Sequence, residues 1–268
     1  MKAAECLINP WRLHTRIGGI TPHDRPLTRS EGYRVQAALA ELTGDRVIGW
    51  KIAATSIDGQ KHINVSGPLA GRLLDSRLKV NGASVSIDSN IMKVAEAEFA
   101  FRMGWDLPPR ATPYTVDEVL AASAALYPAI EVPDSRYHDF SKAGEAQLIA
   151  DFACACWLIL GGRAPESWRS MDLAVHKVSA WIGDQKVADG IGSNVLGDPR
   201  IALAWIANEL SGEGIGLKVD NVVITGTYVA PVAISGGQHF IADFGTLGEV
   251  SARLTGAELK TKGIKSRR

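Results

Sequence analysis

Two carboxylates lie two residues apart in an apolar, strand-like run, Val94-Ala95-Glu96-Ala97-Glu98-Phe99-Ala100-Phe101. Side chains at positions i and i+2 of a strand point to the same face, so Glu96 and Glu98 are predicted to lie side by side. Two like charges this close repel each other unless a positive group lies between them. A hard divalent cation is one candidate, because carboxylate oxygens are its preferred ligands. The alternative is a pair of acids on a solvent-facing strand edge, where charged side chains usually lie.

A third carboxylate, Glu131, lies in a similar apolar segment that is bounded by Pro128 and Pro133. The chain has no cluster of His or Cys ligands that accompanies these acids. Three carboxylates without such a cluster favour Mg²⁺ or Mn²⁺ over zinc.

A lysine among apolar residues, Lys51, follows the β-prone run Arg46–Trp50. Such a lysine is either a surface residue whose ammonium group reaches solvent, or a partly desolvated base with a lowered pKa. The residues themselves leave both interpretations open.

Six segments occur in collinear order between about Leu27 and Leu254: GWKIAATS, GPLAGRLLDS, VAEAEFAF, PAIEVPDSR, LIADFACACWLILGG and TGTYVAPVAISGGQHFIADFGTLGEVSARL. Their succession resembles the fumarylacetoacetate hydrolase superfamily. It is most similar to the branch with the 2-keto-4-pentenoate hydratases, the 2-oxo-hept-4-ene-1,7-dioate hydratases and the 4-oxalocrotonate decarboxylases. The resemblance implies an α+β fold, with a mixed β-roll or barrel like the C-terminal part of fumarylacetoacetate hydrolase and a small helical N-terminal region. We expect an N-terminal α/β region at 1–70, a β-rich catalytic domain at 71–258 and a basic tail at 259–268.

The resemblance also implies roles for single residues. Glu96, Glu98 and Glu131 match the family's ligands for magnesium or manganese, and Lys51 matches the lysine beside the substrate. Asp75 matches a catalytic aspartate, although an Asp that closes a strand into a turn is also ordinary turn chemistry.

One wall of the expected pocket departs from the family pattern. The family usually reads Asp-Asn-Ala-Ser where this chain has Asp151-Phe152-Ala153-Cys154. We expect Asp151 and Cys154 to be substrate-binding, and His62 to reach the pocket from a short helix-like stretch. Phe152 and Cys154 replace an amide and a hydroxyl, which predicts a more apolar wall. Such a wall favours a monocarboxylate with a short or apolar tail over a dicarboxylate, because burying an unpaired carboxylate is costly.

The function that the resemblance implies is a metal-dependent hydratase, which adds water to a 2-hydroxy-2,4-dienoate and gives a 4-hydroxy-2-oxo acid. A metal that chelates the 2-oxo acid would act as a Lewis acid, with Lys51 or an ordered water moving protons. The same enolate stabilisation serves a 4-oxalocrotonate-type decarboxylase, which is the alternative. An acylpyruvate hydrolase is less favoured, because no His here has a Glu three residues away. A non-catalytic binding protein would have little reason to keep three mutually repelling acids.

Composition excludes several other classes of protein. With 268 residues, 46% of them hydrophobic, the chain can bury a full core as one domain with a smaller N-terminal piece. Lys plus Arg equals Asp plus Glu at 29 each, so no basic field favours nucleic acid or an anionic membrane.

We expect a cytoplasmic homo-oligomer that acts on a small 2-oxo acid in aromatic compound catabolism. Cys6, Cys154 and Cys156 predict neither a disulfide framework nor a zinc site.

Local signals predict the main elements. Capping boxes at Thr28–Glu31 and Thr115–Glu118 predict a helix to about Leu42 and an alanine-rich helix leading to Tyr127. Asp198-Pro199 opens a helix from Arg200 to Leu210. The expected β elements are a hairpin around Gly183-Asp184 and strands at Asn221–Thr225, Gln238–Phe244 and Gly248–Leu254. The glycine-rich segment Gly212–Gly216 is predicted to be a loop rather than a dinucleotide fingerprint, and Lys260–Arg268 to be disordered.

Overall fold

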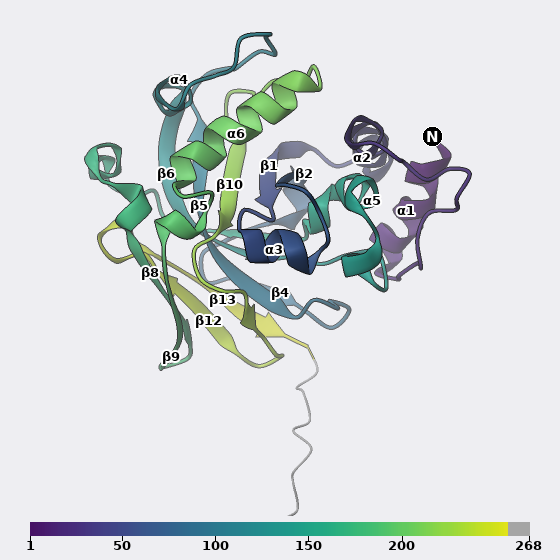
Figure 1. The fold of residues 1–268 in the computed structure, drawn as a ribbon. Helices are drawn as coiled ribbons and strands as arrows, with labels where there is room; N and C mark the ends of the chain where they lie inside the picture. Colours follow the sequence, from purple (N-terminus) through teal and green to yellow (C-terminus); the bar gives the residue numbers. More distant parts are fainter. Residues whose placement is uncertain (257–268) are drawn as a thin grey trace, which may run out of the picture.

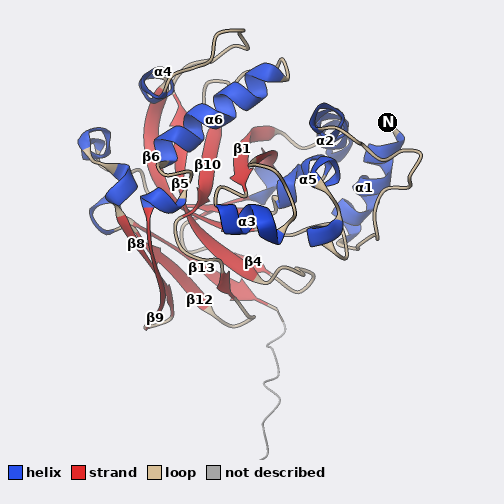
Figure 2. Ribbon diagram, in the orientation of Figure 1, coloured by secondary structure: helices blue, strands red, loops and turns tan. Residues whose placement is uncertain are grey.

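The computed structural model describes residues 1–256, which form two β-sheets with helices packed around them (Figures 1 and 2). The α-helices are α1 (Lys2–Leu13), α2 (Arg29–Thr43), α3 (Ile57–His62), α4 (Val116–Ala121), α5 (Glu145–Ala150) and α6 (Pro199–Gly212). The larger sheet has the spatial order β2 (Leu69–Leu74), β1 (Val47–Ala53), β10 (Val222–Thr227), β5 (Val94–Met103), β6 (Ser123–Val132), β7 (Trp157–Leu160) and β3 (Leu78–Val80), with β11 (Val232–Ala233) paired to β5. The smaller sheet has the order β4 (Ser84–Ser86), β13 (Glu249–Thr255), β12 (His239–Asp243), β8 (Lys177–Ile182) and β9 (Gln185–Ile191). The expected α+β fold with mixed sheets is confirmed.

The two sheets pack against each other through strands from distant parts of the chain. Strands β12 and β13 of the smaller sheet contact β6 of the larger one. Figure 1 shows α6 lying across the larger sheet, while α1, α2 and α5 gather at its other end. The alternation of β5 agrees with the predicted pattern, because Ala95, Ala97 and Phe99 are fully buried in the main core. Phe99 packs there against Tyr228, with ring centroids 5.0 Å apart.

Helix starts follow the local signals closely. Thr28 caps α2 with a complete capping box, and Gly44 ends that helix with a left-handed conformation. Asp198 caps α6, which has Pro199 in its first turn. The hairpin around Gly183-Asp184 is confirmed as β8 and β9, and the three predicted C-terminal strands are confirmed as β10, β12 and β13.

The alanine-rich helix predicted to lead to Tyr127 is wrong. Thr115 does cap α4 with a capping box, but that helix ends at Ala121. The residues from Ser123 onward form β6, which pairs with β5 on one side and with β7 on the other. Helix propensity is a weak preference that tertiary context overrides, and small alanine side chains fit a strand buried on both faces.

The boundary expected at residue 70 falls inside β2, and β1 from the N-terminal region lies between β2 and β10 in the larger sheet. Both regions therefore contribute to one sheet. The predicted end of the catalytic domain at 258 and the basic tail at 259–268 lie outside the described residues. None of the helices in residues 1–256 has the length and apolar character that crossing a membrane requires.

Candidate active site and metal centre

The three predicted acids meet on two adjacent strands. Glu96 and Glu98 lie on β5, and Glu131 lies on β6 directly opposite Glu96. One carboxylate oxygen from each residue lies within 4.8 Å of the other two. Glu98 and Glu131 are each only 1% exposed. The acids therefore do not lie on a solvent-facing strand edge, which was the alternative that the sequence allowed.

The triad is electrostatically unbalanced. Oε1 of Glu98 and Oε1 of Glu131 are buried and have no hydrogen-bond partner among the described residues. Burial, and next the charge of Glu131, raise the pKa of Glu96 to about 7 and raise that of Glu98 well above its ordinary value. Burying unpaired carboxylate oxygens is costly, and a cation among them would remove that cost. The arrangement fits an oxygen-ligated divalent ion such as magnesium.

Lys51 is the cation that the chain itself supplies. It lies within β1, is 3% exposed, and its Nζ is 2.8 Å from Oε2 of Glu131. The parallel pairing of β1 with β10 holds it there, with Lys51 opposite Ile224. Burial lowers the pKa of Lys51, but the neighbouring carboxylates outweigh burial, and the pKa is raised overall. Lys51 is therefore not a surface lysine whose ammonium group reaches solvent. The other prediction, a lowered pKa, is also wrong, because the charges of the neighbouring carboxylates raise the pKa of Lys51.

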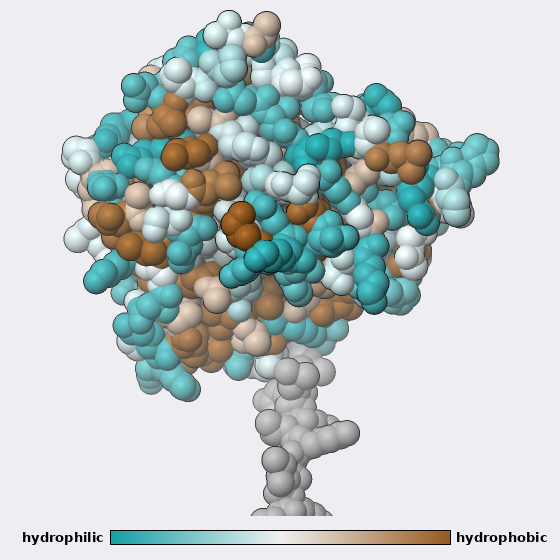
Figure 3. All heavy atoms as spheres, in the orientation of Figure 1, coloured by the Kyte–Doolittle hydropathy of each residue, from teal (hydrophilic) through white to brown (hydrophobic). Residues whose placement is uncertain are grey.

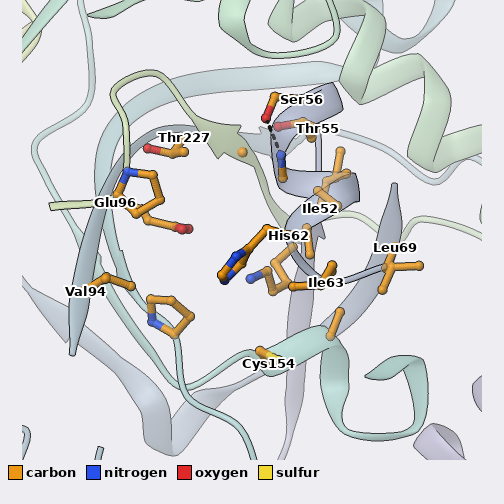
Figure 4. A pocket seen from close by; sticks show the side chains of 18 of the residues that line it. Ile52, Thr55, Ser56, His62, Ile63, Leu69, Val94, Glu96, Cys154 and Thr227 are labelled. Atoms are coloured by element: carbon orange, nitrogen blue, oxygen red, sulfur yellow. Dashed lines mark hydrogen bonds between the residues drawn. The ribbon is translucent and has the colours of Figure 1, made fainter. Parts of the chain in front are cut away.

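A cavity of about 690 Å³ opens beside these residues. Lys51 and Glu96 line it together with Thr55, His62 and Cys154. Figure 4 shows Glu96 and His62 directed into this space from different sides, with Cys154 on a third wall. Its volume lies in the range of about 300–1,000 Å³ that is typical of small-molecule sites.

Known proteins have sequences that are similar to most of this chain. The chain is 33% identical over 244 residues to the 2-hydroxyhexa-2,4-dienoate hydratase of Comamonas testosteroni. The match covers 89% of this chain and 91% of the relative. It is 32% identical over 217 residues to the 2-keto-4-pentenoate hydratase of Burkholderia vietnamiensis, with 81% of each chain covered. This protein belongs to the hydratase and decarboxylase branch of the fumarylacetoacetate hydrolase superfamily. No family model matches the chain.

The structure of 4-oxalocrotonate decarboxylase from Pseudomonas putida G7, complexed with magnesium and adipate, superimposes with a TM-score of 0.84. The two proteins are 28% identical, and the match covers 94% of this chain and 96% of the decarboxylase. The fold of this superfamily member is therefore the one that its sequence segments implied.

His62 and Cys154 both line the cavity of this family member, as the sequence predicted for substrate-binding residues. His62 ends α3 and is exposed, and its ring centroid lies 5.9 Å from that of Phe140. Cys154 is buried, and burial raises the pKa of its thiol to about 12. This thiol is therefore a weakly polar wall group at neutral pH rather than a nucleophile.

Asp151 does not reach the cavity lining. Its side chain is fully buried, forms an ion pair with Arg136, and accepts a hydrogen bond of 2.9 Å from Ser135 Oγ. Phe152 also points away from the cavity, and packs edge to face on Trp11 with centroids 5.2 Å apart. The prediction that Phe152 makes the pocket wall apolar is therefore wrong, because the backbone turns left-handed at this point.

Asp75 is also outside the cavity lining. Its carboxylate is 44% exposed and pairs with Arg46 at 2.9 Å. In the antiparallel pairing of β1 and β2, Lys51 lies opposite Gly71. Asp75 follows four residues later along the chain, which corresponds to about 13 Å of strand. The fold does not bring Asp75 and Lys51 together.

Sequence reasoning missed the group that orients Glu98. The backbone N–H of Gly226 donates a hydrogen bond of 2.7 Å to Oε2 of Glu98. Gly226 has a φ of 103°, and a Cβ there would lie 2.2 Å from Oγ1 of Thr55. Only glycine fits both the conformation and the contact. The Thr-Gly-Thr sequence at 225–227 was the available signal.

Proposed function

We propose that the protein is a hydro-lyase, a metal-dependent hydratase that adds water to a 2-hydroxy-2,4-dienoate of the 2-keto-4-pentenoate type and forms a 4-hydroxy-2-oxo acid. The observation that carries the proposal is the contact of buried Lys51 with a cluster of three carboxylates, two buried and one half-buried, beside a small-molecule cavity. Two relatives that are 33% and 32% identical and carry hydratase names support it.

The proposed cofactor is Mg²⁺ or Mn²⁺, held by Glu96, Glu98 and Glu131. The two buried carboxylate oxygens without a partner support this assignment, as does the magnesium in the structure of the decarboxylase relative. When bound, such an ion supplies a Lewis acid to the carboxylate and the 2-oxo oxygen of the substrate.

Each of the chain's own residues has a distinct task in this proposal. Lys51 holds a proton at Nζ within reach of the substrate, and transfers it as the dienol becomes the hydrated keto acid. The N–H of Gly226 fixes the orientation of Glu98. Cys154 and His62 contact the substrate. Asp151 does not contact it, but pairs with Arg136 and so holds the backbone turn that places Cys154. Asp75 has no part in the reaction.

Decarboxylation of a 4-oxalocrotonate-type acid is the second candidate. It is favoured by the likeness to the P. putida decarboxylase, and the same enolate stabilisation serves both reactions. Hydrolysis of an acylpyruvate is less supported, because the His and Glu three residues apart that we expect of such hydrolases are absent from the sequence.

Two substrates separate these functions. Purified protein with Mg²⁺ is incubated with 2-hydroxypenta-2,4-dienoate and, separately, with 4-oxalocrotonate, and the loss of dienol absorbance and the release of carbon dioxide are followed. We expect hydration of the first substrate, its loss with a chelator or in Lys51→Met, and its retention in the exposed control Lys218→Met. Carbon dioxide release from the second substrate without hydration of the first would contradict the proposal.

The proposal extends to a cytoplasmic homo-oligomer that acts in aromatic compound catabolism. Large apolar side chains that are exposed in the single chain, among them Leu13 at 68%, Leu27 at 79% and Val80 at 76%, are ones that an interface between subunits would cover. Light scattering coupled to size-exclusion chromatography measures the mass of the assembly, and a monomer at micromolar concentration would contradict this part.

A further inference from the structure

We infer that the substrate carries an apolar tail of about four or more carbons beyond the dienoate and has no second carboxylate. This inference rests on the proposed function, and it names the substrate class that the cavity selects. It comes from the division of the cavity into a charged end and a long apolar end.

The division follows the two-residue period of the strands. On β5, Glu98 and Glu96 are followed on the same face by Val94, and on β6 Glu131 is followed on the same face by Pro133. On β1, Lys51 is followed on the same face by Ala53. Glu96, Val94, Pro133, Lys51 and Ala53 all line the cavity. On each of the three strands, the next residue on the same face, two positions along the chain, therefore changes the cavity wall from charged to apolar.

Residues next to these strands and from α5 add further apolar side chains to the lining. Leu69 lies opposite Ala53 in the β1–β2 pairing, and Leu148 comes from α5. Ile63, Phe140 and Met92 also line the cavity. All three are partly buried and pack against the main core. Over this end lies α3, a helix with no buried residue, and Figure 3 shows hydrophilic side chains gathered there beside hydrophobic ones.

A five-carbon dienoate is too short for this space. Val94 lies about 7 Å further along the strand than Glu96, which is longer than the three carbons that such a molecule has beyond its 2-oxo acid end. The cavity of about 690 Å³ is instead of the size that holds drug-sized ligands. A short substrate would leave the apolar walls in contact with water, whereas an apolar tail would displace that water favourably.

The charges around the cavity oppose a distal carboxylate. Among the described residues that line it there is no arginine, and the one lysine, Lys51, is already paired with Glu131. Asp58 lines the rim with a side chain that is 98% exposed and pairs with Lys61 at 4.0 Å, so this pair adds no net positive charge that would hold a second carboxylate. His62 is the only other basic side chain on the described lining.

A substrate series tests the inference. The kcat/KM of the Mg²⁺-loaded protein is measured for 2-hydroxy-2,4-dienoates with no tail, with unbranched alkyl tails of increasing length, and with a terminal carboxylate. Because each buried methylene contributes about 0.8 kcal/mol, kcat/KM should rise about fourfold per methylene over the first four. A flat or falling series overturns the inference but leaves the proposed hydratase intact. Hydration of none of the substrates overturns the proposed function itself.

A matched pair of methionine variants locates the tail. Met92 and Met171 are both partly buried against the main core, but only Met92 lines the cavity. Met92→Ala should lower the ratio of kcat/KM for the long-tailed over the tailless substrate by about threefold or more, since it removes apolar contact with the tail. Met171→Ala should leave this ratio unchanged. An unchanged ratio in Met92→Ala overturns the placement. A preference for the dicarboxylate overturns the substrate class, and its loss in His62→Ala would assign the second carboxylate to His62.

Discussion

At the scale of single residues, one lysine faces three carboxylates in a place that water hardly reaches. Lys51 pairs with Glu131 through a contact of 2.8 Å, but Oε1 of Glu131 and Oε1 of Glu98 have no hydrogen-bond partner among the described residues. Burial, and next the repulsion between like charges at this separation, raise the pKa values of Glu96 and Glu98. The site is therefore arranged for a cation that the chain does not itself provide.

Replacing Glu98 by Gln tests this arrangement. The amide keeps an oxygen that can accept the hydrogen bond from Gly226, but it removes one negative charge. We expect Mg²⁺ affinity by calorimetry to fall by about tenfold or more, because magnesium prefers charged oxygen ligands. In the presence of a chelator the variant should melt at a higher temperature than the unaltered protein, because a buried repulsion is gone. The exposed control Glu249→Gln should change neither, and an unchanged Mg²⁺ affinity in Glu98→Gln would remove Glu98 from the metal site.

Lys51 is predicted to matter for turnover rather than for metal binding. Lys51→Met keeps much of the side-chain volume and removes the proton-carrying group. Turnover should fall by about a hundredfold or more, the range for a positioned proton-transfer group, while Mg²⁺ affinity stays within a few-fold. Steady-state kinetics with calorimetry on the same preparation checks both. Turnover that stays near the original value would make Lys51 a charge-balancing residue only.

At the scale of elements, a left-handed turn brings Cys154 to the cavity. Phe152, Ala153 and Cys154 have φ angles of 53°, 49° and 64°, a conformation that costs about 1–3 kcal/mol for each such residue. Arg136 holds the two ends of this turn, since it donates to the carbonyl of Asp151 at 2.7 Å and to that of Ala155 at 3.2 Å. The turn also presses on β2, where a Cβ at Gly71 would lie 1.9 Å from the carbonyl oxygen of Phe152.

Asp151→Asn should loosen this turn. It leaves the buried guanidinium of Arg136 without its charged partner, which costs about 3–5 kcal/mol in comparable buried pairs. Urea denaturation measures the loss of stability, and KM should rise because Cys154 shifts. Asp139→Asn breaks an exposed pair with Lys142 and should cost less than about 1 kcal/mol. A loss no larger than in this control would mean that the ion pair does not hold the turn.

At the scale of the whole molecule, the site ties together strands from both regions of the chain. Its residues come from β1, β5 and β6, and β10 supplies the N–H that orients Glu98. A ligand that joins these strands should therefore stabilise the complete fold and not only one element.

Thermal unfolding with and without Mg²⁺ measures this coupling. An ion that binds only the folded protein, present at about a hundred times its Kd, contributes about 2.7 kcal/mol. For a chain of this size the melting temperature should rise by about 5 °C or more. Glu98→Gln should lose most of this rise. A melting temperature that does not respond to Mg²⁺ or Mn²⁺ would contradict a metal site within the fold.

The local sequence is enough to predict the features that depend on neighbours along the chain. Glu96 and Glu98 share a face because strand side chains alternate, whatever the surrounding fold. Thr28 and Asp198 begin helices because their side chains satisfy N–H groups only two or three residues away. These effects involve few residues, so the pattern is enough to predict them.

Tertiary structure alone decided which distant residues meet. The register of β5 against β6 brings Glu131 to Glu96, and the pairing of β1 with β10 buries Lys51 beside them. Pairing with β5 and β7 turned an alanine-rich segment into β6, and the packing of the chain brought Asp151 to Arg136 and left Asp75 at the surface. Register and burial come from the packing of the whole chain, because each strand gains its hydrogen bonds and its apolar contacts only from partners that are remote in sequence.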